Sequence, residues 1–471
     1  MSEDIRGKLD PERIQVTPAW HLPGYDGIED PPEGKPDQPL APALTEREAT
    51  AVAETVRAAA LRARDELSFE QVVRHVSRAA MRLADPGDPL GGEAELRLKS
   101  GLGWSELAAR ESLRGMAREW TEDALTSLVR SELGDPLYLE RFVEVAGQPG
   151  RYRRATGPPL ILQIHAGNVP GVPVSAAILA LLARSGVLAK SGSDEPWMLP
   201  LFARALADEN ALLGSALAVT SWPGNQQPPA LRIWAKESGK AIVYGGEEAV
   251  RALRGRLPPD TEMIVYGPRI GVAVFLSDAA EADPGRLAKD VLAYDQRGCV
   301  SPRLVLEVGS NSLELARRLE RELSKEAGRL GPPPMTDEEA VAVRRARTAC
   351  EFEGMKDGST LVLGSSDLAW TVLARSRPGV SSEALPRTIW LYGVRENDDL
   401  GPLLRPLAGR IQAIGVAGRD GASGLAELAA SLGVSRVCPV GSMAWPPTDW
   451  RQEGRHRLLP LLDWTEWENQ D

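Results

Sequence analysis

One short stretch, residues 293–303, holds a cysteine in a setting suited to covalent chemistry. Gly298 precedes Cys299 and Pro302 follows it, so the backbone must bend there, and residues 304–308 have the apolar pattern of a buried strand. A thiol on such a turn is presented to a ligand instead of being packed away. The stretch therefore holds a candidate nucleophile, because a thiolate attacks carbonyl carbon readily.

Three charged residues flank this thiol: Asp295, Arg297 and Arg303. Such charges can keep a cysteine partly ionised, which favours nucleophilic attack. An isolated cysteine between aliphatic runs is also often a small apolar core residue. From the local sequence alone, both interpretations of Cys299 stand.

Three further stretches upstream each place a glycine turn at the end of a predicted strand. They are residues 165–171 (His-Ala-Gly-Asn-Val-Pro-Gly), 187–193 (Val-Leu-Ala-Lys-Ser-Gly-Ser) and 243–247 (Val-Tyr-Gly-Gly-Glu). The carboxyl ends of parallel strands meet at one edge of a sheet, where ligands bind. Each stretch alone is ordinary, and their combination ahead of the cysteine is what indicates a site.

In this order and at these spacings, the stretches resemble the aldehyde dehydrogenase superfamily. Its cofactor domain carries a Pro-Trp-Asn turn, a Lys-Pro-Ser turn and a Thr-Gly-Ser turn before a Gly-Gln-x-Cys nucleophile. Within it, the chain is most similar to the bacterial acyl-CoA reductases of the bioluminescence type, which make fatty aldehyde. That narrower resemblance rests on Gly-Asn-Val-Pro at 167–170 and Asp-Gln-x-x-Cys-x-Ser-Pro at 295–302.

The resemblance covers roughly residue 45 to the C-terminus and implies two catalytic roles. Cys299 would attack a thioester carbonyl, expel the donor thiol and carry the acyl group. Asn168 matches the family's oxyanion donor, which would act together with the backbone N–H of Cys299. An asparagine in a turn also often bonds its own backbone, so a structural role for Asn168 stays open.

The resemblance also implies a nicotinamide cofactor site. Lys190 matches the lysine that holds the adenosine ribose, although a strand-end lysine can also be a solvated charge. Ser193 stands where many NAD-preferring relatives have a glutamate, so NADPH is expected and NADH remains possible. Gly245 and Gly246 would let the backbone approach the cofactor phosphates at the N-terminus of the next helix.

Two residues of the first turn, His165 and Gly167, are further candidates for cofactor binding. For His165, a packed position at the strand end is the alternative, since a buried imidazole needs no ligand.

One departure from the family pattern bears on the reaction. Aldehyde-oxidising members carry a glutamate base in a Leu-Glu-Leu-Gly-Gly stretch, and the matching residues 264–268 are Ile-Val-Tyr-Gly-Pro. Without a base for the hydrolytic water, reduction of a medium- or long-chain acyl thioester to an aldehyde is the leading hypothesis. The alternatives are a hydrolytic aldehyde dehydrogenase and a non-catalytic scaffold that partners an acyl-activating enzyme.

Composition narrows the class of protein. The 471 residues are 43% hydrophobic and 26% charged, which is typical of a soluble protein, and the net charge of -11 argues against nucleic acid as a partner. The three cysteines are widely spaced and predict neither disulfides nor a zinc site, so a cytoplasmic location is expected. The longest apolar run, residues 175–183, is too short to cross a bilayer.

The elements that would position these residues form an α/β fold. The resemblance implies an aldehyde dehydrogenase-like architecture, with a helical N-terminal layer, a Rossmann-type cofactor domain and an α/β catalytic domain. The expected parts are an extended arm (1–44), helices and cofactor domain (45–268), catalytic domain (269–437) and tail (438–471). The predicted strands are 160–165, 186–190, 216–220, 241–244, 263–266, 272–276, 304–308, 360–363, 388–391 and 413–416.

The tail is rich in tryptophan, with Trp445, Trp450, Trp464 and Trp467. These residues predict either a cap on the core or a contact between subunits, and the family favours a homo-oligomer. The expected substrate donors are acyl-CoA or an acyl-protein, with an acyl-synthetase as a possible partner.

Overall fold

A computed structural model describes residues 18–25 and 41–469, except 225, 227, 310 and 382. The N-terminal layer is helical as predicted: α1 (Glu46–Glu66), α2 (Phe69–Arg82), α3 (Pro89–Leu102), α4 (Glu106–Ala117) and α5 (Glu122–Leu133). Thr45 and Ser68 each form a capping box at the predicted helix start. Within this part of the chain no helix combines the length and apolar character that crossing a membrane requires.

The first sheet has five parallel strands in the order β5-β4-β3-β6-β7. Their bounds are β3 (Leu160–Ile164), β4 (Gly186–Lys190), β5 (Leu217–Thr220), β6 (Lys240–Tyr244) and β7 (Glu262–Tyr266). The helices between them are α6 (Gly171–Leu182), α7 (Met198–Glu209), α8 (Ala211–Ser215), α9 (Pro229–Glu237) and α10 (Glu247–Arg254). Alternate residues of the strands pack on α6 and α7 or on α1 and α9, so both faces of the sheet are buried.

The second sheet has seven strands in the order β10-β11-β12-β9-β8-β13-β14, and β10 joins it antiparallel. Its strands are β8 (Ile270–Phe275), β9 (Pro302–Val308), β10 (Thr360–Gly364), β11 (Thr371–Arg375), β12 (Thr388–Val394), β13 (Ile411–Ala417) and β14 (Arg436–Pro439). One face packs on α11 (Asp283–Leu292) and α12 (Ser312–Leu330). The other packs on α13 (Asp337–Gly354), α14 (Leu400–Leu404) and α15 (Ala422–Ser431).

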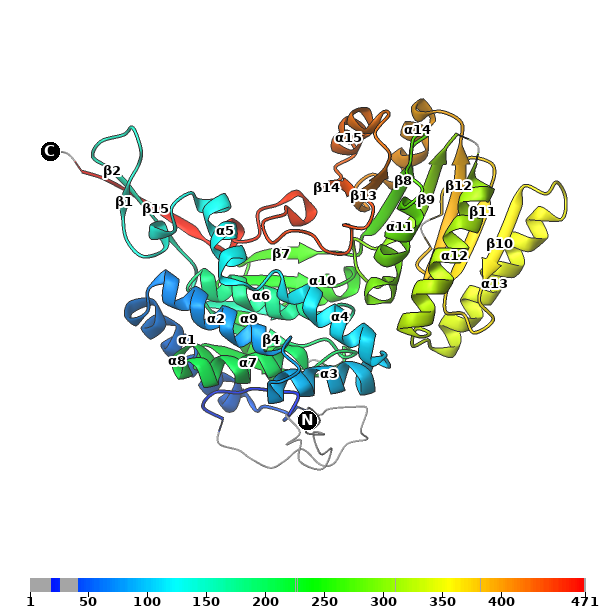
Figure 1. Cartoon of the computed structure of the whole chain (residues 1–471). Coiled ribbons are helices and arrows are strands. Elements are labelled where there is room, and N and C mark those ends of the chain that lie inside the picture. The colour runs from blue at the N-terminus through cyan, green and yellow to red at the C-terminus, as the bar shows by residue number, and fades with distance from the viewer. Residues whose placement is uncertain are drawn as a thin grey trace, which may run out of the picture.

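A third, antiparallel sheet stands apart from the other two (Figure 1) and contains β1 (Val143–Glu144), β2 (Arg151–Thr156) and β15 (Asp463–Glu468). The chain leaves the second sheet at β14 and runs alongside the first sheet before it reaches β15 (Figure 1). The tail thus joins three parts of the fold. All ten predicted strands exist, whereas β1, β2, β11, β14 and β15 were missed.

Three of the four tryptophans of the tail divide between the two expected roles, and Trp450 borders a cavity described below. Trp445 packs beside Tyr294 in the interior, with 5.0 Å between ring centroids. Trp464 and Trp467 on β15 are 43% and 47% exposed. The interior part therefore caps the core, and a subunit contact of β15 stays a prediction.

Part of the predicted N-terminal arm packs against the first sheet. Ala19 and Leu22 are buried, and His21 forms an antiparallel bridge with Val219. The His21 ring also bonds the carbonyl of Gly214 at 3.0 Å, which ties this part of the arm to the fold. The remainder of the arm, residues 1–17 and 26–40, lies outside the described residues.

Candidate active site

Cys299 lies between a short 3-10 helix (Ala293–Gln296) and β9, and it borders a cavity of about 90 Å³. The cavity wall is mostly apolar and comes from the end of α4, the start of α6, the end of β6 and the tail. Its lining includes Met116, Glu119, Val169, Val172, Tyr244, Tyr294, Trp450 and Arg457. Cys299 thus borders a cavity and also packs, partly buried, against Val300 and Met443, and its role as nucleophile stays a prediction.

The turn before Cys299 has an unusual backbone. Tyr294, Asp295 and Gln296 all have positive φ, at 51°, 53° and 62°. Such conformations cost about 1–3 kcal/mol per residue outside glycine, so the surroundings must hold them. The turn is therefore set by tertiary contacts and not by local preference.

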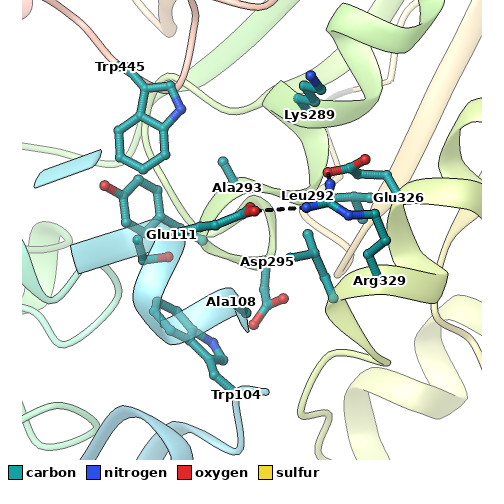
Figure 2. Close-up of a pocket in the computed structure, with 13 residues that line it drawn as sticks. Trp104, Ala108, Glu111, Lys289, Leu292, Ala293, Asp295, Glu326, Arg329 and Trp445 are labelled. Carbon is teal, nitrogen blue, oxygen red and sulfur yellow. Dashed lines mark hydrogen bonds and ion pairs between the residues drawn. The ribbon is translucent and has the colours of Figure 1, made fainter. Parts of the chain in front are cut away.

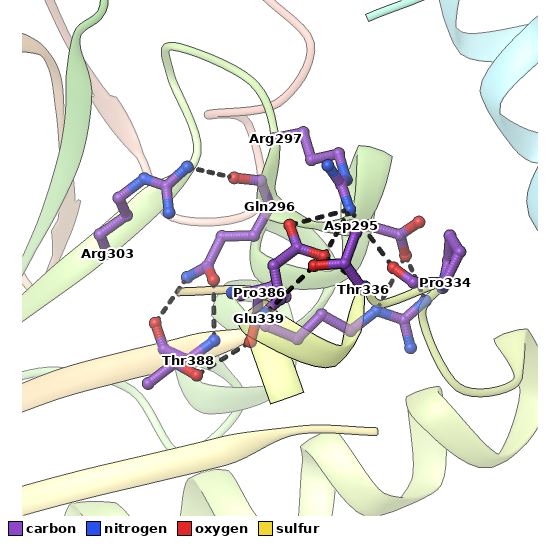
Figure 3. A network of polar contacts seen from close by, with 10 residues as sticks. Asp295, Gln296, Arg297, Arg303, Pro334, Thr336, Glu339, Pro386 and Thr388 are labelled. Carbon is purple, nitrogen blue, oxygen red and sulfur yellow. Dashed lines mark hydrogen bonds and ion pairs between the residues drawn. The ribbon is translucent and has the colours of Figure 1, made fainter. Parts of the chain in front are cut away.

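Those contacts come from the start of β12 and the residue before it (Figure 3). Gln296 donates to the carbonyl of Thr388 at 2.9 Å and accepts from the Thr388 N–H at 2.8 Å. The Arg387 guanidinium donates two hydrogen bonds to one oxygen of Asp295, at 2.9 and 2.6 Å, and both side chains are buried. This buried ion pair and the amide clamp fix the turn that carries the thiol.

The charges near Cys299 do not ionise it. Burial, and then the negative charge of Glu453, raise the pKa of Cys299 to about 11. Arg297 instead pairs with Glu339 at 3.3 Å, and Arg303 donates to the Gln296 carbonyl at 2.9 Å. The expectation that flanking charges keep the thiol partly ionised was wrong, because these residues hold the turn.

Asn168 lies beside the same turn. Its side-chain amide donates a hydrogen bond to the carbonyl of Arg297 at 3.0 Å, and the residue is exposed. An amide has two N–H groups, so a second donor stays available for an oxygen near Cys299. The structure therefore brings Asn168 and Cys299 together, and the oxyanion role of Asn168 stays a prediction.

A carboxylate that the sequence did not suggest lies close to this site. Glu453, from the tail, accepts from the Gly267 N–H at 2.9 Å and from Arg269 at 3.0 Å, and its side chain is 5% exposed. Gly267 belongs to the stretch that lacks the family's glutamate. A different chain segment thus supplies a carboxylate to that stretch.

The cavity also contains a partly buried ion pair missed by sequence reasoning. Arg457, which is 7% exposed, bonds Glu119 at 3.2 Å, and both residues line the Cys299 cavity. Glu132 accepts from the backbone N–H groups of residues 457–459, which anchors this part of the tail. No local motif marks these residues, because each acquires its role only through the path of the tail.

The predicted cofactor residues lie along the carboxyl edge of the first sheet. Lys190 is 7% exposed, and burial lowers its pKa. His165 is packed face to face with Tyr244, with 5.4 Å between centroids, and burial lowers the pKa of His165 to about 3. Its ring Nδ1 has no partner among the described residues. His165 therefore occupies a packed position at the strand end, and its contact with a cofactor stays a prediction.

The glycines of these turns differ in their surroundings. A Cβ on Gly167 would lie 2.7 Å from the Glu195 nitrogen, so Gly167 allows two turns to pack closely. A Cβ on Gly245 would meet Ala249 at 3.2 Å, whereas one on Gly246 would meet nothing within 4 Å. Gly246 is the N-cap of α10 and has no side chain to occupy the free N–H groups there. Of the three, only Gly246 faces open space that a ligand could use.

Ser193 borders a second, larger cavity of about 500 Å³ at the same sheet edge. Thr220, Trp222 and Ala230 contribute to its wall, and the described lining contains no carboxylate. A cavity of this size with an aromatic wall can take a nucleoside.

The sequence profile of the acyl-CoA reductase (LuxC) family matches residues 65–464. The chain belongs to this family. Among curated LuxC-type relatives, the long-chain acyl-protein thioester reductase of Aliivibrio fischeri is 23% identical over 73% of this chain and 71% of its own length. The enzyme of the same name from Photorhabdus luminescens is 24% identical over 73% of this chain and 70% of its length.

Solved aldehyde dehydrogenase structures share the fold of this LuxC-family chain. An NAD-dependent benzaldehyde dehydrogenase from Corynebacterium glutamicum has a TM-score of 0.71 and 14% identity, covering 97% of this chain and 99% of its own. Aldehyde dehydrogenase C from Pseudomonas syringae, solved with NAD+ and octanal, also has a TM-score of 0.71 and 14% identity, covering 98% and 97%. The predicted superfamily fold is confirmed.

Proposed function

We propose that this protein reduces an acyl thioester to an aldehyde through an acyl-Cys299 intermediate, with NADPH as reductant. The observation that carries the proposal is that Cys299 opens into an apolar cavity while Asn168 is bonded to the same turn. Membership of the acyl-CoA reductase (LuxC) family supports the same reaction class.

In the first step, the Cys299 sulfur bonds to the thioester carbonyl carbon, and the bond from that carbon to the donor sulfur breaks. The donor leaves as a thiol, and its proton balances the one that Cys299 loses. The Asn168 amide and the Cys299 N–H hold the oxygen as it gains charge. The apolar wall around the thiol excludes water from the acyl-enzyme.

In the second step, the acyl carbon is reduced. When bound, the nicotinamide cofactor supplies a hydride. The resulting hemithioacetal oxyanion collapses: its C–S bond breaks, the aldehyde leaves, and the Cys299 thiolate takes a proton from solvent. Asn168 would stabilise the oxygen again at this stage.

Three features fit a nicotinamide cofactor. The Ser193 cavity of about 500 Å³ would take its adenosine, and Lys190 at the end of β4 would hold the ribose. Gly246 leaves the first N–H groups of α10 open to phosphate. The lack of a carboxylate at Ser193 favours NADPH over NADH.

We extend to this chain the long-chain acyl-protein thioester in the relatives' names and, from the family description, acyl-CoA as a second donor. An acyl-synthetase is a fitting source of such a donor.

Labelled acyl-CoA followed by mass spectrometry tests the intermediate. We expect label on the Cys299 peptide in the wild type and none in Cys299→Ala, together with loss of aldehyde formation. Label elsewhere, or activity retained in Cys299→Ala, would overturn the proposal. A shift in melting temperature with NADPH separates this enzyme from a scaffold that binds only a partner protein.

The variant Ser193→Glu tests the cofactor assignment. A carboxylate there would repel a 2′-phosphate, so kcat/KM should fall for NADPH relative to NADH. The NADH rate of the same variant is the internal control for folding. An unchanged ratio would place the adenosine elsewhere.

One observation favours a hydrolytic outcome as a second candidate. Glu453 acts electrostatically on Cys299 and accepts a hydrogen bond from Gly267, in the stretch that lacks the family's glutamate. Both of its oxygens already accept hydrogen bonds, from Gly267 and Arg269, which weakens it as a base for water. Chromatography of the products decides, because hydrolysis yields free acid and reduction yields aldehyde.

A further inference from the structure

A third cavity, of about 280 Å³, lies between α4, the turn before Cys299 and α12. Trp104 and Trp445 stand on one side of it, and Arg329 and Glu326 stand on the other (Figure 2). Ala108, Leu292, Ala293, Tyr294 and Leu330 complete an apolar and aromatic lining, with Glu111, Ser112, Lys289 and Asp295 as the other polar members.

This cavity lies back to back with the Cys299 cavity. Tyr294 lines both of them. On α4, Ser112 borders the larger cavity and Met116, one turn later, borders the Cys299 cavity. In the tail, Trp445 borders the larger cavity, and its neighbours on either side border the Cys299 cavity. The same three segments therefore form a shared wall, and the Tyr294 ring is part of it.

Close packing and hydrogen bonds hold the segments that form this shared wall. The ring of Tyr294 lies 5.0 Å from that of Trp445 and 6.4 Å from that of Trp104, measured between centroids. Asp295, the next residue, is held by Arg387. Gly115 lies directly under Trp445, since a Cβ there would be 1.9 Å from the indole. A side-chain rotation of Tyr294 would connect the two cavities without a change in the backbone of the turn.

The polar groups around the larger cavity are largely satisfied by one another. Arg329 pairs with Glu111 at 2.9 Å and with Glu326 at 2.5 Å (Figure 2), and Arg329 and Glu111 are about half exposed. Lys289 is exposed. Asp295 has one oxygen without a partner among the described residues, but its charge is balanced by Arg387. The charges thus form a rim at the solvent side, and the aromatic side is the part that can bind an apolar group.

We propose that this cavity is the distal part of the acyl site, which takes the far end of a long acyl chain past Tyr294. The inference rests on the proposed acyl-thioester reduction. The Cys299 cavity of about 90 Å³ has room for the reacting carbon and a short part of the chain, and the larger cavity extends it on the other side of Tyr294. The far end of the acyl group would lie near the charged rim, and this rim sets an upper limit on the length of the acyl group.

Two variants that line only the larger cavity test this with butyryl-, dodecanoyl- and hexadecanoyl-CoA. Ala108→Phe fills the cavity and should lower the dodecanoyl-to-butyryl ratio of kcat/KM at least about tenfold. Trp104→Ala enlarges it and should raise the hexadecanoyl-to-dodecanoyl ratio. Ala51→Phe, on the exposed face of α1, is the matched control and should leave both ratios within about twofold of wild type.

The outcomes separate this inference from the proposed function. Ratios that stay at wild-type values in both cavity variants, in an active enzyme, overturn the distal site and leave the reduction intact. A wild type that reduces no acyl thioester overturns both. If Ala108→Phe does not fold, the opposite shift in Trp104→Ala still decides.

Discussion

Glu453→Gln is expected to make Cys299 more reactive. The pKa of Cys299 is raised to about 11, whereas a free cysteine has a pKa of about 8.5. At pH 7.5 the thiolate fraction is then about 3 in 10,000, compared with about 1 in 10 for the free residue, so alkylation should be about 300-fold slower. Loss of the Glu453 charge lowers the pKa of Cys299, and every unit by which that pKa falls would speed alkylation about tenfold.

The assay is timed alkylation with iodoacetamide from pH 7 to 10.5, followed by mass spectrometry of each cysteine peptide. Cys438 is a reference within the same sample, because burial raises its pKa to about 11 and Glu453 is not among the causes. Glu453→Gln should raise the ratio of the Cys299 alkylation rate to the Cys438 alkylation rate. An inflection for wild-type Cys299 below pH 9, or a ratio that the substitution leaves unchanged, would refute the reasoning.

Three substitutions should lower stability in a fixed order. Arg387→Met leaves the buried Asp295 unpaired and should cost about 3–5 kcal/mol in urea unfolding; a cost under about 1 kcal/mol would contradict a role in holding the turn. Gly192→Ala puts a Cβ 2.3 Å from the Gly167 nitrogen and should cost about 1–3 kcal/mol, seen as a lower melting temperature, unless the two turns can separate. Thr45→Ala removes the capping box of α1 and should cost about 1 kcal/mol, so a loss as large as that of Arg387→Met would point to a wider role.

The sheets that carry the site could be predicted because their strands are continuous apolar runs. Residues of β3, β4 and β6 are buried on both faces, and such strands are legible from hydrophobicity alone. β2 and β15 are different, since β15 is exposed along its length and both carry charges. Their pairing uses ion pairs across the strands, such as Arg153 with Glu466 at 2.8 Å, between residues far apart in the chain.

The candidate site also has features that could be predicted from the sequence and features that could not. Cys299, Asn168, Lys190 and Ser193 could be proposed as site residues because each lies at or next to the end of a strand within its own local motif. The polarity of their surroundings could not be predicted from the sequence, since the pKa of Cys299 depends on burial and on Glu453 of the tail. Local charge suggested an ionised thiol, but each flanking charge has a structural partner.

Glu453 weakens the argument for reduction that was based on the missing family glutamate at residues 264–268. Its absence from residues 264–268 argued for reduction because no base was evident for water. The structure brings a carboxylate to Gly267 from 186 positions further along the chain. The lack of a residue at one position therefore does not establish the lack of the group in the site. What limits Glu453 as a base is that Gly267 and Arg269 occupy both of its oxygens, so the case for reduction depends on those two hydrogen bonds and on the identity of the product.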